Sequence, residues 1–174
     1  MHDIDTDREP KDVGRLVGIF IAPERGAPPV ARDAATAVVG RGLAGDRYYH
    51  GTGTFSARAG LFAGARELSL IDAAAVERCN ARLRAAGARE VGAGDLRRNL
   101  VIAGLDLRAH RGRTLVIGAV HVVVRSTCPP CGYLGRRLGV DMRSALRGIG
   151  GVRAAVARGG RLAVGMPVSG LDDG

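Results

Sequence analysis

Short runs of β-branched and aliphatic residues, separated by glycine turns, are the feature that most constrains the fold of this chain. Such runs between turn residues are typical of strands. They predict strands at residues 15–21, 34–39, 67–71, 99–103, 114–117, 120–124, 152–156 and 162–164. Two hairpins are predicted where glycine turns join neighbouring runs, one at Gly118-Ala119 and one at Arg158-Gly159-Gly160.

An alanine-rich segment, residues 73–86, predicts the main helix, because Asp72 suits an N-cap and Gly87 is typical of the position after a helix. Cys79 falls on the apolar face of this segment and is predicted to be a core residue. Residues 134–146 predict one or two short helices. Many strands and few helices together predict a mainly β (α+β) fold, a β-barrel with one main helix and short helices at its edge.

The length of 174 residues suits one domain. The polar start of the chain, residues 1–13, is predicted to be a flexible leader, and residues 14–170 a single domain. No apolar run is long enough to span a membrane, and the first residues lack the basic-then-apolar order of a signal peptide. Three cysteines, an odd number, argue against a disulfide framework. We therefore expect a cytoplasmic protein with no membrane partner.

The net charge is +9, and nearly all the cationic residues are arginines, since Lys11 is the only lysine. Two interpretations stay open: a solvated basic surface, or a site lined with guanidinium groups that hold an anion. Nucleic acid is the generic partner of such a charge. However, the arginines are spread along the chain, and six Tyr and Phe residues with no Trp offer few rings for base stacking. A nucleic-acid partner is therefore disfavoured.

The segment that carries the most chemistry runs from Arg125 through Cys128 to Cys131, with two prolines between the cysteines. It follows a predicted strand and precedes a predicted helix. A helix N-terminus and a nearby arginine both favour the thiolate form of cysteine. Thiolate is the form that binds soft metals or carries sulfur. The sequence therefore predicts a functional thiol here, in one of several chemical roles.

Four interpretations of this thiol pair stay open. A structural zinc site has only two of its four ligands, because His110 and His121 lack paired spacing. Thiol–disulfide exchange suits Cys-Pro-Pro-Cys, but a hairpin late in a β-rich chain is unlike the βαβ start of thioredoxins. The two cysteines could also be packed side chains without chemistry. The fourth interpretation is a single functional thiolate.

Four blocks of sequence favour the fourth interpretation: residues 40–56, 95–107, 125–134 and 150–168. In this order and spacing they resemble the MOSC family, the domain that ends eukaryotic molybdenum cofactor sulfurases and also stands alone in bacteria. The resemblance covers roughly residues 14–168. It implies a β-barrel-like fold, binding of molybdenum cofactor, and a family cysteine that matches Cys131, as metal ligand and catalytic residue or as sulfur carrier.

The resemblance also implies an activity, because related proteins reduce N-hydroxylated bases and amidoximes. No ferredoxin-type cysteine cluster is present, so electrons would come from an external electron-transfer protein, or sulfur from a donor protein. A carrier of sulfur or cofactor without turnover of its own remains an alternative. A thiol–disulfide protein and a basic nucleic-acid-binding module are further alternatives.

The other blocks are expected to hold the cofactor, with guanidinium groups at its phosphate and amide or hydroxyl groups at its pterin or oxo ligands. These predicted contacts are Arg97, Arg98, Asn99, Arg125, Ser126, Thr127, Gly42, Asp46 and Arg47. Structural roles are equally open. Asp46 and Arg47 could pin the glycine-rich loop of residues 40–60, Asn99 could cap a strand, and Ser126 and Thr127 could close a strand end.

Overall fold

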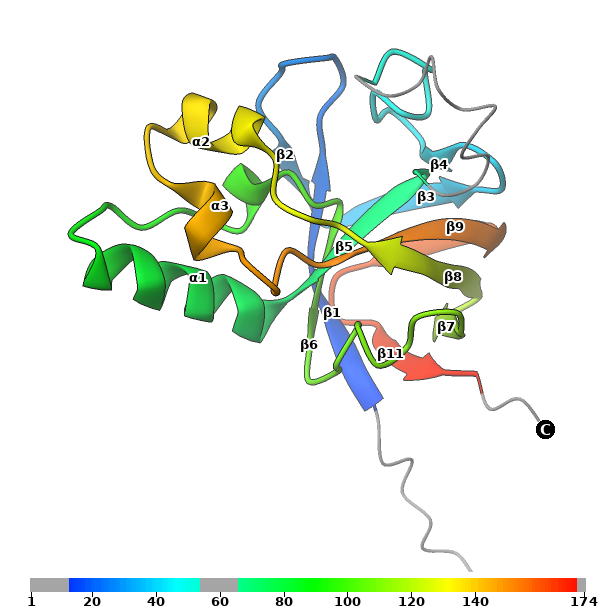
Figure 1. The fold of residues 1–174 in the computed structure, drawn as a ribbon. Helices are drawn as coiled ribbons and strands as arrows, with labels where there is room; N and C mark the ends of the chain where they lie inside the picture. Colours follow the sequence, from blue (N-terminus) through cyan, green and yellow to red (C-terminus); the bar gives the residue numbers. More distant parts are fainter. Residues whose placement is uncertain (1–12, 54–65, 172–174) are drawn as a thin grey trace, which may run out of the picture.

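The computed structural model describes residues 13–53 and 66–171 (Figure 1). The predicted leader lies outside this part of the chain except for Val13, and so do residues 54–60 of the predicted glycine-rich loop. The described strands are β1 (Val13–Ile21), β2 (Val30–Arg32), β3 (Ala34–Val38), β4 (Gly42–Leu43), β5 (Leu68–Asp72), β6 (Leu100–Ala103), β7 (Thr114–Ile117), β8 (Val120–Thr127), β9 (Val152–Arg158), β10 (Gly160–Ala163) and β11 (Pro167–Gly170). The described helices are α1 (Ala73–Ala85), the 3₁₀ turn η2 (Gly94–Leu96), α2 (Gly132–Leu138) and α3 (Met142–Ala145).

Seven strands close into a barrel in the order β11-β7-β8-β9-β5-β6-β1, because β1 pairs with both β6 and β11. Its nine residues allow this double role: Val13–Arg15 pairs with β11, and the middle of the strand pairs with β6. The β5–β6 pair is parallel and the other pairs in the ring are antiparallel. Closure satisfies the strand edges internally. The predicted mainly β barrel is confirmed, and its strand pairing is mixed.

Aliphatic side chains fill the barrel by alternation along each strand. In β8, Val120, Val122 and Val124 are fully buried while the residues between them are half-buried. The predicted hairpin at Gly118-Ala119 is confirmed, since Ile117 pairs with Val120 across it. Alternating burial of this kind is expected when one face of each strand turns to a closed interior.

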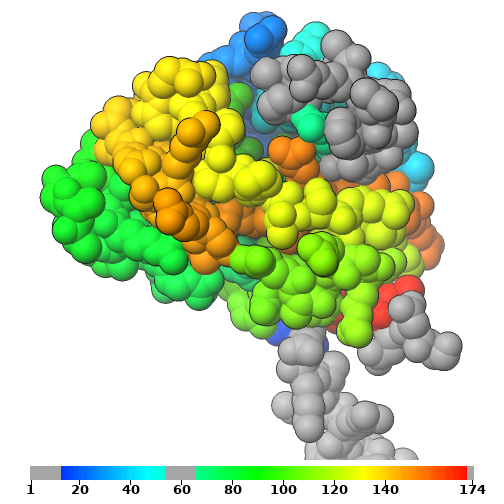
Figure 2. Space-filling view, in the orientation of Figure 1, coloured from blue at the N-terminus to red at the C-terminus, as the bar shows by residue number. Residues whose placement is uncertain are grey.

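The helices lie together on one side of the barrel, and the space-filling view shows them packed directly against it (Figures 1 and 2). A second apolar core joins them to the barrel wall. Cys79 of α1 is fully buried there, so the prediction that it is a core residue is confirmed. The two short helices predicted at residues 134–146 are α2 and α3, separated after Gly139, whose φ of +68° ends α2 in a left-handed turn.

The second predicted hairpin is wrong. β9 pairs with β5 and β8, whereas β10 pairs with β3 in a separate sheet of order β10-β3-β4. Only Gly159 stands between β9 and β10, which is too short for a reversal, so the chain passes from one sheet directly into the other. A Cβ atom on Gly159 would lie 2.7 Å from the carbonyl oxygen of Ala37, so glycine is required at this crossing.

Three described strands were not predicted: β2, β4 and β11. Each is short, and all three contain or follow proline or glycine, which weakens a local strand signal. They form because a longer neighbour offers free backbone groups, as β1 does for β2 and β11. Among the described residues, none of the helices has the length and apolar character that crossing a membrane requires.

Candidate functional site

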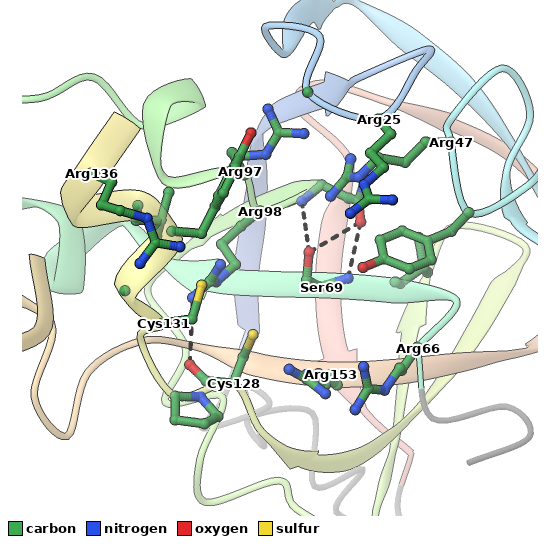
Figure 3. Close-up of a pocket in the computed structure, with 18 of the residues that line it drawn as sticks. Arg25, Arg47, Arg66, Ser69, Arg97, Arg98, Cys128, Cys131, Arg136 and Arg153 are labelled. Atoms are coloured by element: carbon green, nitrogen blue, oxygen red, sulfur yellow. Dashed lines mark hydrogen bonds between the residues drawn. The ribbon is translucent and has the colours of Figure 1, made fainter. Parts of the chain in front are cut away.

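A pocket of about 770 Å³ lies between the helical side and the barrel, and arginine dominates its walls (Figure 3). No carboxylate is among the described residues that line it. The wall comes from the segment after β1, the loop after β4, the start of β5, the turn before β6, the link from β8 to α2, and from α2, α3 and β9. Its arginines are Arg25, Arg47, Arg66, Arg97, Arg98, Arg136, Arg143 and Arg153.

Both cysteines of the Cys-Pro-Pro-Cys segment line this pocket, but they differ in exposure. Cys131 precedes α2 as its N-cap residue and is exposed, whereas Cys128 is 7% exposed. The backbone N–H of Cys128 donates to the carbonyl of Gly151 at 2.8 Å, which ties the segment to the start of β9. Of the three cysteines in the chain, Cys131 alone is exposed.

The zinc interpretation lacks a ligand set in the described ranges, where no three side chains among His, Cys, Asp and Glu gather as ion ligands. Cys79 is sealed in the helical core, and burial raises the pKa of its thiol. It therefore stays a protonated, apolar side chain and cannot complete the site.

Arg98, predicted as a phosphate contact, braces the cysteine segment. It is 7% exposed, and its guanidinium donates to the carbonyls of Gly150 at 2.8 Å, Leu96 at 3.0 Å and Cys128 at 3.4 Å. These carbonyls belong to three separate segments. The Arg98 guanidinium therefore links the turn before β6 to the segment after β8 and to the segment before β9. Three of the guanidinium N–H groups donate to backbone carbonyls, and Arg98 still lines the cavity.

Asp46 and Asn99 form a buried polar network beneath the pocket. Asp46 is 1% exposed and accepts from the backbone N–H groups of Ala22 at 3.0 Å and Tyr48 at 3.1 Å. The Asn99 amide donates to Asp46 at 3.4 Å and accepts from the backbone N–H and the hydroxyl of Ser69, each at 3.1 Å. The carboxylate thus pins the loop after β4, and only Asn99 of the two lines the cavity.

Arg47 and Arg97 face the cavity as a pair of like charges. Arg47 is 8% exposed, lies 3.4 Å from the Asp46 carboxylate and stacks over the Tyr48 ring at 4.7 Å. Arg97 has a φ of +59° and donates to the carbonyl of Ala27 at 2.6 Å. Burial, and next the charge of Arg47, lower the pKa of Arg97. A negatively charged ligand between them would relieve both effects.

The pocket therefore brings Cys131 together with four of the predicted cofactor contacts, Arg47, Arg97, Arg98 and Asn99. The others do not line it. They are Gly42, Asp46, Arg125, Ser126 and Thr127. Gly42 has a φ of +88°, and its Cα packs against the Glu67 carbonyl with no room for a Cβ, which explains that glycine by backbone packing.

Several lining residues were missed by sequence reasoning. They are Arg25, Arg66, Ser69, Tyr48, Tyr133, Arg136, Arg143 and Arg153. They come from segments far apart in the chain, and strand register joins them: Ser69 of β5 pairs with Arg153 of β9. The excess of arginine was the one available signal, and it could not say which arginines would gather.

Several solved structures share this fold. The YuaD protein from Bacillus subtilis has a TM-score of 0.73 at 20% identity, covering 90% of this chain and 94% of that one. YiiM from Geobacillus stearothermophilus has a TM-score of 0.67 at 17% identity over 92% and 76% of the two chains, and YiiM from Escherichia coli 0.65 at 15% over 92% and 71%. No curated protein sequence matches the chain. The model of the MOSC domain matches residues 47–169, which include most of the residues that line the pocket and most of the barrel, and the chain therefore belongs to the MOSC domain family.

Proposed function

We propose that the arginine-lined pocket binds molybdenum cofactor, with the Cys131 thiolate at the metal and Arg47 and Arg97 at the phosphate. The observation that carries this proposal is that the one exposed cysteine lines the same cavity as eight arginines of the described ranges. Membership of a family linked to this cofactor supports it.

The residues fit the chemistry of the cofactor, which is a pterin with a dithiolene and a phosphate. A cavity of about 770 Å³ lies within the range usual for small-molecule sites, which is roughly 300–1,000 Å³. An exposed thiol supplies soft ligation. The Arg47–Arg97 pair supplies guanidinium forks whose mutual repulsion a phosphate would cancel. Asn99 at the floor can present amide groups to a pterin edge.

When bound, the cofactor supplies a two-electron redox centre, and we propose that the protein uses it to reduce N-hydroxylated compounds. Conversion of an N–OH group to N–H takes two electrons and two protons and releases water. The electrons come from a separate donor protein, because the described residues hold no cluster of metal ligands. The part of this chain is to hold the cofactor, to admit substrate beside Cys131 and to keep counter-charges in place through Arg98 and Asp46.

A second candidate function, transfer of sulfur or cofactor without turnover, is favoured by one observation. The Cys131 thiol is exposed, so the active centre of a partner protein can reach it. A persulfide on Cys131 detected by mass spectrometry, together with no reductase activity after cofactor loading, would select this function over reduction.

Metal analysis tests the cofactor proposal directly. Protein purified from a host with an active cofactor pathway is expected to hold about one molybdenum per chain, and protein from a pathway-deficient host none. Cys131→Ser is expected to lose most of the metal. Cys79→Ala is the matched control, because it removes a buried thiol outside the pocket. Molybdenum at the wild-type level in Cys131→Ser would remove the assigned role of this thiol.

A further inference from the structure

The pocket carries more positive charge than the cofactor needs. Eight arginines of the described part of the chain line it, while a phosphate monoester has a charge of about −1.5 to −2 near neutral pH. Arg47, Arg97 and Arg98 already have a carboxylate or backbone carbonyls as partners. The guanidinium groups of Arg25, Arg136, Arg143 and Arg153 have no hydrogen bond or ion pair with any residue of the described ranges. Unpaired guanidinium groups that share one cavity repel one another unless an anion lies between them.

Two of these four arginines converge beside the reactive thiol. A Cβ atom on Gly132, the residue after Cys131, would lie 3.1 Å from Nη1 of Arg136 and 3.5 Å from Nη2 of Arg143. Both guanidinium groups therefore reach the same point, although one comes from α2 and the other from α3. Figure 3 shows Arg136 beside Cys131, with Arg47 across the cavity. The two positions match a separate binding point for a second anionic group.

We infer that Arg136 and Arg143 form a second anion subsite, and that the substrate reduced beside Cys131 carries a phosphate group that binds there. This inference rests on the proposed reductase function and names its substrate class. Two converging forks suit a phosphate, whose three terminal oxygens can accept from both groups at once. Both arginines are exposed and line the cavity, so a ligand from solvent can reach them. The rings of Tyr48 and Tyr133 also line the pocket and offer faces to a flat, unsaturated substrate.

Arginine footprinting tests the subsite without any activity measurement. Cofactor-loaded protein is treated with phenylglyoxal with and without saturating inorganic phosphate, and modification of each arginine is followed by mass spectrometry. We expect phosphate to slow modification of Arg136 and Arg143 at least about threefold. Arg158 and Arg161 are exposed arginines outside the pocket, and their modification is expected to stay unchanged. Equal protection of all four, or no protection of the first two, would overturn the inference.

The same experiment distinguishes a phosphate of the substrate from a phosphate of the cofactor. It also distinguishes failure of the cofactor proposal from failure of the anion subsite. If Arg136 and Arg143 are already protected in loaded protein without added phosphate, a nucleotide extension of the cofactor occupies the subsite and the substrate assignment is wrong. Protein from the pathway-deficient host is the second arm. Protection by phosphate in that protein, alongside a failure to bind molybdenum in the first host, would contradict the cofactor proposal while leaving the anion subsite standing.

Kinetics test the substrate class. An N-hydroxylated nucleoside and its 5′-monophosphate are compared as substrates of the loaded protein. We expect the phosphorylated form to have a KM lower by about tenfold or more, the usual effect of charge-assisted hydrogen bonds. Arg136→Gln with Arg143→Gln is expected to abolish that difference with kcat little changed. Arg158→Gln with Arg161→Gln removes the same charge as a control. Equal loss of preference in both double variants, or no preference in the wild type, refutes the assignment.

Discussion

Arg98→Met is the substitution that most directly tests whether the pocket is built on an arginine brace. Methionine keeps most of the aliphatic stem and removes the guanidinium that donates to Gly150 at 2.8 Å and Leu96 at 3.0 Å, with a longer bond to Cys128. All three acceptor residues are buried, so water cannot replace the lost donors without opening the structure. The variant tests structure alone when it is measured without cofactor.

The magnitude follows from those bonds. A hydrogen bond to a charged group contributes about 1.5–3 kcal/mol, so two well-formed bonds give about 3–6 kcal/mol. Removing the charge also removes the cost of burying it, which moves the expected loss of unfolding free energy to about 3 kcal/mol. Domains of this size are stable by about 5–15 kcal/mol, so the variant is expected to fold with a clearly lower urea midpoint.

Urea denaturation followed by circular dichroism at pH 7 measures this loss. Arg158→Met, at an exposed position of β9, is the matched control and is expected to change the free energy by less than about 0.5 kcal/mol. Arg98→Lys retains one cationic donor and is expected to lie between wild type and Arg98→Met. A loss of unfolding free energy below about 1 kcal/mol in Arg98→Met would show that the Arg98 guanidinium does not stabilise the pocket.

Three further substitutions probe the scaffold. The Glu67 carboxyl accepts a hydrogen bond from the backbone N–H of Val156, and burial raises the pKa of Glu67. Its contribution to stability is therefore fully present below the pKa of the unfolded state and is lost as pH rises through the pKa of the folded state. Glu67→Gln is expected to flatten that fall in thermal melts as pH rises above the ordinary pKa of glutamate; an unchanged profile contradicts this assignment. Asn99→Asp sets a second carboxylate beside Asp46 and is expected to destabilise by about 2 kcal/mol at pH 7, with partial recovery on acidification; stability equal to wild type at pH 7 would exclude the repulsion. Leu100→Ala, at a fully buried barrel position, is expected to lose about 2–5 kcal/mol in urea unfolding, and a loss under 1 kcal/mol would place it outside the tight core.

The helices and hairpins whose signals lie in residues adjacent in the sequence could be predicted. The alternation around Gly118 predicted the β7–β8 hairpin, and the cap and stop residues of α1 placed that helix within one residue of its observed end. Even so, the Asp72 side chain makes no capping hydrogen bond and accepts from the N–H of Leu107 at 3.4 Å. Residue type predicted where the helix begins, whereas packing decided what the carboxylate does.

Strand pairing was not predictable in the same way. Gly159 has the local character of a turn residue, yet it carries the chain from β9 into another sheet. Local pattern predicts that a segment is extended, but its partner depends on closing the whole ring. The closing pair of β1 with β11 joins residues separated by more than 150 positions. Such contacts follow from burying the common core, which no short window of sequence contains.

Residue chemistry alone marked Cys131 as the thiol of interest and arginine as the group to meet an anion. The fold then sorted the arginines into different roles. The register between β5 and β9 brought Arg153 to the cavity, whereas Arg125 of β8 does not line it, and backbone carbonyls accept most of the hydrogen bonds that the Arg98 guanidinium donates. A guanidinium can pair with a carboxylate, a carbonyl or a ligand at similar cost, so only the three-dimensional neighbours of each one decide which partner it takes.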